Sequence, residues 1–196
     1  MNRLAATLLA LSAFLLAACQ SAPPVPENRY YRVHASSTTA PANPLLKAEV
    51  AVLPLRAEGL YSERALLFSD GARTLQQYHY HHWLYAPNCL LQEFLADQFR
   101  QAGLATKVHG AEHRNEAPYA VSGRIVNLER IAPQNKARVT LELRLDKNGK
   151  RLWQQTYSTE EAMTENSIPA YVLATEHALQ RITADFVGDL RRARID

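Results

Sequence analysis

A stretch of strict alternation in the second half of the chain constrains the fold more than any other feature. Residues 139–145 read VTLELRL, so every second side chain from Val139 to Leu145 is apolar and those between are polar or charged. Because successive side chains of a strand point to opposite faces, this pattern predicts a strand with one buried face. The Asn148-Gly149 pair that follows is typical of a two-residue hairpin turn into a second strand over residues 151–159.

Two segments have the spacing of amphipathic helices that can cover such a face. The first begins at Pro87-Asn88 and ends at Gly103, and the second has Ser167 as its N-cap and Pro169 in its first turn. Their apolar residues recur at intervals of three and four, which predicts helices with one buried side. These positions are Leu90, Leu91, Phe94, Leu95 and Phe99 in the first segment, and Ile168, Val172, Leu179, Ile182, Phe186 and Leu190 in the second.

The remaining apolar runs are short and rich in strand-forming residues. Strands are predicted over residues 29–34, 47–55, 64–69, 74–83, 104–108 and 119–128, with a bulge at Val126, where the alternation changes phase. Asp70-Gly71 marks a hairpin between two of them. The order of elements predicts an α+β fold in which a mixed β-sheet has two helices packed on one face. We expect residues 29–196 to form this single domain.

The first residues are typical of an export signal. Residues 1–18 place Arg3 before an apolar run that is too short to span a bilayer. Leu16-Ala17-Ala18-Cys19 resembles the lipobox of bacterial lipoproteins, which implies cleavage before Cys19 and its lipidation. An ordinary secretory signal is the alternative, since small residues also permit its cleavage. By the same resemblance, Gln20 in place of aspartate implies sorting to the outer membrane.

The mature chain is expected to consist of a lipid anchor, a tether and a folded domain. Residues 20–28 are rich in proline and polar residues and would reach about 25 Å at about 3.1 Å per residue. Two or more acyl chains on Cys19 would hold the protein stably at a membrane. Removing residues 1–18 takes away one arginine and no acid, which changes the net charge from +3 to +2. With its basic residues dispersed, the chain is not expected to bind nucleic acid.

Residues 76–87, QQYHYHHWLYAP, hold three histidines that suggest a metal site. In a strand, His79 and His81 share one face, and Tyr78, Tyr80 and His82 share the other. Zinc needs at least a third protein ligand, and the segment offers no Asp, Glu or Cys. We therefore predict an aromatic, hydrogen-bonding strand without a bound metal, and no cofactor elsewhere.

The other reactive residues also have structural explanations. His109-Gly110-Ala111-Glu112-His113 matches the inverted zinc-protease pattern, but that chemistry requires a helix, and this segment is predicted to be a connecting loop. Cys89 precedes Leu90 and Leu91, which favours a buried, inert thiol. The chain has no nucleophile elbow, P-loop or dinucleotide-binding motif, so we do not expect an enzyme.

Several motifs taken together resemble a known family. In order they are VAVLPL at 50–55, ERALLFSD at 63–70, LxxYxYHxWxxxP at 75–87 and LxxxLxxxFxxAG at 91–103. This series is similar to the ABC-type transport auxiliary lipoproteins, the PqiC-like periplasmic partners of MCE-domain lipid transporters. In the second half only the order of strands and helix matches.

The resemblance implies a non-enzymatic lipoprotein on the periplasmic face of the outer membrane. It would dock there to the MCE protein of an ABC transporter, as a homo-oligomeric ring that matches the symmetric partner. Arg64, Tyr80, Trp83 and Tyr85 are the candidate interface residues, because arginine and aromatic residues dominate binding hot spots. For Trp83, packing in the core is the alternative. The alternative functions are a stand-alone lipid- or ligand-binding lipoprotein and a structural envelope lipoprotein.

Overall fold

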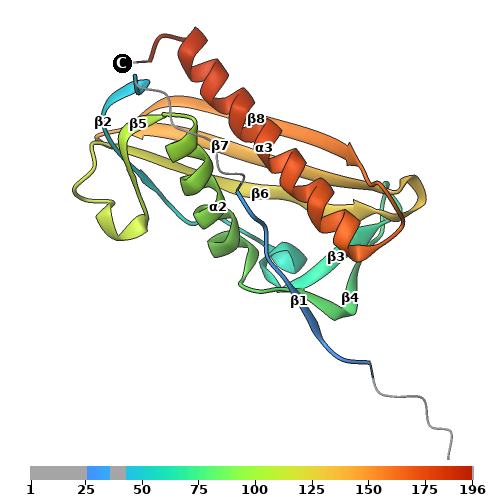
Figure 1. Cartoon of the computed structure of the whole chain (residues 1–196). Coiled ribbons are helices and arrows are strands. Elements are labelled where there is room, and N and C mark those ends of the chain that lie inside the picture. Colours follow the sequence, from blue (N-terminus) through green and yellow to red (C-terminus); the bar gives the residue numbers. More distant parts are fainter. Residues whose placement is uncertain (1–25, 36–42, 196) are drawn as a thin grey trace, which may run out of the picture.

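The computed structural model describes residues 26–35 and 43–195 as a mixed eight-stranded sheet with two α-helices packed against it (Figure 1). The predicted α+β architecture is confirmed. The signal segment and Cys19 lie outside the described residues. The elements, in chain order, are β1 (Arg29–Tyr31), β2 (Leu46–Val52), β3 (Ala65–Ser69), β4 (Leu75–Trp83), α2 (Pro87–Gln101), β5 (Ala105–His109), β6 (Tyr119–Ile131), β7 (Lys136–Lys147), β8 (Lys150–Ala162) and α3 (Ile168–Arg192).

The long strand β6 organises the sheet. Along one edge it pairs with antiparallel β7, which in turn pairs with antiparallel β8. Along its other edge, β2 pairs in parallel with the beginning of β6 and β3 pairs in parallel with its end. Strand β5 extends the sheet beyond β2, while β4 and then β1 extend it beyond β3. The result combines parallel and antiparallel pairs, as a mixed sheet requires.

The β7–β8 hairpin has the turn that its sequence predicts. Asn148 and Gly149 both have positive φ angles, of 49° and 80°, which suits the right-handed twist of the flanking strands. Strand β6 is irregular between Ile125 and Asn127, where the change of phase in the sequence indicated a bulge. Both local features were therefore predictable from the residues.

Both helices lie on the same side of the sheet (Figure 1), with α2 near β5 and β2 and α3 across β7 and β8. Phe99 of α2 and Phe186 of α3 meet with ring centroids 5.5 Å apart. Under α3, the apolar residues of β7 from Val139 to Leu145 are fully buried. The Ser167 hydroxyl caps α3 by accepting a hydrogen bond from the Ala170 amide at 3.2 Å.

The turn that connects β3 to β4 is stabilised by hydrogen bonds from three backbone amides to the carboxylate of Asp70. Asp70 Oδ1 accepts hydrogen bonds from the backbone amides of Ala72, Arg73 and Thr74, at 2.9–3.1 Å. These donors favour the ionised form and lower the pKa of Asp70 to about 2. The hairpin predicted at Asp70-Gly71 is confirmed, and its aspartate fixes where β4 begins.

The predicted alternation of side chains along β4 is wrong in its second half. Ala65 pairs with His82 and Leu67 pairs with Gln77, so β4 advances five residues while β3 advances two. An odd number of extra residues exchanges the two faces of a strand. Tyr78 and His81 consequently come together, with ring centroids 5.7 Å apart. No local signal in the sequence marks this irregularity.

Candidate docking surface

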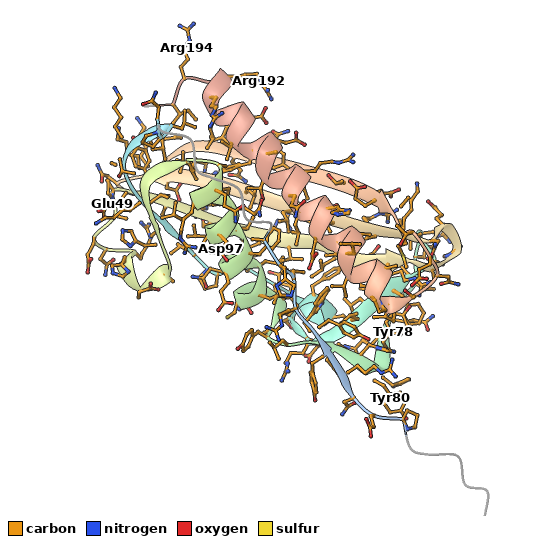
Figure 2. The ribbon with its side chains drawn as sticks, in the orientation of Figure 1. Glu49, Tyr78, Tyr80, Asp97, Arg192 and Arg194 are labelled. Atoms are coloured by element: carbon orange, nitrogen blue, oxygen red, sulfur yellow. The ribbon has the colours of Figure 1, made fainter. Side chains whose placement is uncertain are left out.

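Three exposed tyrosines belong to the first strand and to the segment that begins with its partner strand. Tyr30 of β1, Tyr80 of β4 and Tyr85 in the β4–α2 connection have exposed fractions of 54%, 42% and 53%. β1 is paired with β4, and Figure 2 shows Tyr80 beside the end of the ribbon where the chain enters the fold. We call Tyr30, Tyr80, Tyr85 and Arg64 the tyrosine surface. Tyr30 was not among the residues predicted from the sequence, because its exposure depends on the pairing of β1 with a distant strand.

Arg64 holds the parts of this surface together. Its Nε donates to the Trp83 carbonyl at 3.2 Å, and one terminal nitrogen donates to the Leu84 carbonyl at 2.7 Å. Its guanidinium carbon also lies 5.3 Å from the centroid of the Tyr30 ring, within the range of a cation–π contact. Arg64 therefore links the end of β4 to Tyr30 of β1.

Trp83 does not belong to this surface, which corrects its place among the candidate interface residues. Its side chain is only 1% exposed and lies against Tyr171 of α3, with ring centroids 6.2 Å apart. The alternative, that Trp83 packs in the core, is the one that the structure supports. Trp83 is the last residue of β4, and its indole lies beneath α3, where a large apolar side chain fills the space between the sheet and the helix.

Two of the three histidines of β4, His81 and His82, have hydrogen-bond partners. The Tyr31 hydroxyl and His81 Nδ1 are 2.9 Å apart, and His82 Nε2 lies 3.4 Å from Asn28 Oδ1. Burial, reinforced by the nearby charges of Arg29 and His82, lowers the pKa of His81 and favours its neutral form. Over residues 26–35 and 43–195, no group of three or more His, Cys, Asp or Glu side chains is placed to hold a metal ion.

The residues of the protease-like pattern lie at the end of β5 and in a short 3-10 helix, Ala111–His113. The His109 and His113 rings stack with centroids 4.5 Å apart, and His109 Nε2 lies 3.0 Å from Oε2 of Glu49, which Figure 2 labels. Stacked rings do not direct two nitrogens at one ion, and the segment lacks the α-helix that the zinc-protease motif needs. The segment connects β5 to β6, as predicted.

The prediction for Cys89 is wrong, since its thiol is exposed. Cys89 lies in the first turn of α2, where Leu90 and Leu91 are buried. Successive residues of a helix point about 100° apart, so two buried leucines do not bury the residue before them.

Among the described residues, no helix is long and apolar enough to cross a membrane.

The fold and surface define a sheet-and-helix domain that follows a lipobox-like segment and presents an aromatic surface near its first strand. Residues 31–187 match the family of ABC-type transport auxiliary lipoprotein components. The chain belongs to this family, and the resemblance seen in its motifs is confirmed. Its members are auxiliary lipoproteins of ABC-type transport.

Solved structures support the fold. Protein XCC0632 from Xanthomonas campestris, of the family DUF330, is 19% identical, with a TM-score of 0.70 over 82% of this chain and 93% of that one. An uncharacterised protein is 10% identical, with a TM-score of 0.64 over 84% of this chain and 99% of the other. Comparison with curated protein sequences gives no significant match.

Proposed function

We propose that this protein is the auxiliary lipoprotein of an MCE-type ABC system that moves lipids between membranes. In this proposal Cys19 anchors it to the periplasmic face of the outer membrane, and residues 29–196 form the domain that docks to the MCE protein. Family membership supports the transport role, because the match spans residues 31–187. The observation that carries the docking step is the tyrosine surface, where three tyrosines are exposed and Arg64 donates hydrogen bonds to the backbone between Tyr80 and Tyr85.

The composition of the tyrosine surface suits a protein interface. Tyrosine provides a large apolar ring with a polar end and few rotatable bonds, so little conformational entropy is lost on binding. Arg64 makes its hydrogen bonds within the domain, which reduces the cost of ordering the surface when a partner arrives. Aromatic side chains that become buried when a partner binds contribute most of the binding energy in many interfaces.

We further propose that several copies form a closed ring around the symmetric end of the MCE protein. In a closed ring each copy presents the same surface to the axis or to its neighbour. A symmetric partner can then contact every copy in the same way. In an extended conformation, a tether of residues 20–28 would span on the order of 25 Å and keep the first strand, with the tyrosine surface, close to the membrane.

Replacing both Tyr80 and Tyr85 by alanine is expected to weaken capture of the MCE protein at least about tenfold, since hot-spot residues contribute ~2 kcal/mol or more each. The melting temperature should stay close to that of the wild type, because both side chains are exposed. The measurement is co-purification of the MCE protein with the full lipoprotein from detergent-solubilised envelopes.

Arg151→Ala is the control, because Arg151 is exposed on β8, at the edge of the sheet opposite to β4 and β1. It should leave capture unchanged. If the double tyrosine variant captures as much MCE protein as Arg151→Ala does, the tyrosine surface is not the docking site.

A further inference from the structure

The face of the sheet opposite the helices contains a cavity of about 620 Å³. Three arginines line it: Arg56 in the segment after β2, Arg124 on β6 and Arg144 on β7. Arg56 and Arg124 are neighbours across a bridge between their backbones, and Arg144 pairs with Ser122, two residues from Arg124. The sheet pairing thus brings together three positive charges that are far apart in the sequence.

The carboxylates near the cavity occupy only some of the N–H donors of its three arginines. Arg56 pairs with Glu58 at 2.6 Å, Arg124 Nε with Glu142 at 3.3 Å, and Arg144 Nε lies 3.1 Å from Asp146 Oδ2. Of these carboxylates only Glu142 lines the cavity, so the lining side chains carry three positive charges and one negative charge. A guanidinium has five N–H donors, and one carboxylate contact leaves most of them available.

Two buried polar atoms of the lining residues lack a hydrogen-bond partner within the described part of the chain. They are the hydroxyl oxygen of Ser122, a residue only 9% exposed, and Nε of Arg144, whose approach to Asp146 does not have hydrogen-bond geometry. Buried polar atoms of this kind are uncommon in folded proteins, and a bound ion is one recognised explanation. Both belong to residues that line the same cavity, one on each of two paired strands.

Between the side chains of Ser122 and Arg124, the cavity is lined by the backbone of Gly123. Gly123 lies between Ser122 and Arg124, and a Cβ placed on it would come within 2.0 Å of the Glu142 carbonyl oxygen. Any other residue would therefore disturb the pairing of β6 with β7. The glycine keeps the two strands close, so that Arg124 and Arg144 project from adjacent strands into the same space.

We propose that this cavity binds a phosphate group, with Arg56, Arg124 and Arg144 around it and the Ser122 hydroxyl as a further donor. A carboxylate is satisfied by one guanidinium in a bidentate contact, whereas a phosphate offers several oxygens in a tetrahedral arrangement and accepts from several arginines at once. The phosphate is that of a phospholipid headgroup or free inorganic phosphate. The headgroup assignment rests on the proposed function in lipid transport, while the phosphate chemistry does not.

The test is isothermal titration of the full lipoprotein in detergent micelles with two probes. One probe is inorganic phosphate, and the other is dihexanoylphosphatidylglycerol below its micelle concentration. The wild type is expected to bind at least one of them. Arg124→Gln should weaken that binding at least about tenfold, which corresponds to about 1.4 kcal/mol.

The control is Arg181→Gln, which removes an equally charged, ion-paired arginine from α3, on the other side of the sheet. It should change the dissociation constant by no more than roughly twofold, because a distant exposed charge has a small effect. Melting curves of both variants establish that each is folded.

Each outcome either distinguishes a phospholipid headgroup from free inorganic phosphate or contradicts the proposed phosphate site. Binding of the short-chain lipid with loss in Arg124→Gln supports a headgroup, and binding of inorganic phosphate alone supports the free anion. Failure of both probes to bind, or equal binding by Arg124→Gln and Arg181→Gln, overturns the phosphate site. Since no MCE protein takes part in the titration, failure here leaves the docking proposal untouched, and failure of docking leaves this site untouched.

Discussion

Replacing Trp83 by alanine is expected to lower the free energy of unfolding by about 3–5 kcal/mol. The indole is buried between the end of β4 and Tyr171 of α3, and its removal would leave a cavity that these elements cannot fill without moving. Single domains are stable by about 5–15 kcal/mol, so the loss would be a large part of the total. Urea denaturation followed by circular dichroism measures it.

Tyr85→Ala is the control for this prediction. Tyr85 is two residues further along the chain and more than half exposed, so its removal should change the free energy of unfolding by roughly 0.5 kcal/mol or less. A Trp83→Ala variant that is as stable as Tyr85→Ala would contradict the packing of β4 against α3 described here.

Cys19→Ser is expected to remove the protein from the outer-membrane fraction. Serine has no thiol to form the thioether, so no acyl chains attach at the start of the tether. The variant should appear as a soluble periplasmic protein or as an unprocessed precursor. Fractionation of envelopes on a density gradient, followed by detection of the protein in each fraction, provides the measurement.

The second cysteine of the chain provides the matched control. Cys89 is exposed on α2 and belongs to the folded domain, so Cys89→Ser is expected to fractionate with the outer membrane, as is proposed for the wild type. Outer-membrane fractionation of Cys19→Ser would disprove lipidation at Cys19. Loss of membrane association in Cys89→Ser would instead place the attachment in the domain.

Features set by neighbouring residues were predictable from the sequence. The alternation over residues 139–145, the Asn148-Gly149 turn, the bulge near Val126 and the Ser167 cap each depend on contacts within a strand pair or one helical turn. Their physical causes, namely side-chain period, positive φ and an available hydroxyl, can be recognised directly in the residues.

Features that depend on distant pairing were not predictable. The irregular register of β4 against β3 determines which aromatic residues of β4 face solvent. This register cannot be predicted from the residues of either strand alone. The wrong prediction for Cys89 has a different origin, because the geometry of the predicted helix already turns its thiol outward from Leu90 and Leu91. Arg56, Arg124 and Arg144 are separated by up to 88 positions in the chain, and only the order of the strands brings them to one cavity.

The most direct test of the proposed function is crosslinking of the wild-type lipoprotein in native envelopes, followed by its isolation and mass spectrometry. The proposal predicts crosslinked oligomers of this chain together with an MCE-domain protein, joined through peptides that contain Tyr80 or Tyr85. Recovery of the lipoprotein only as a monomer, with no MCE-domain protein attached, would contradict docking and favour a stand-alone lipid-binding protein.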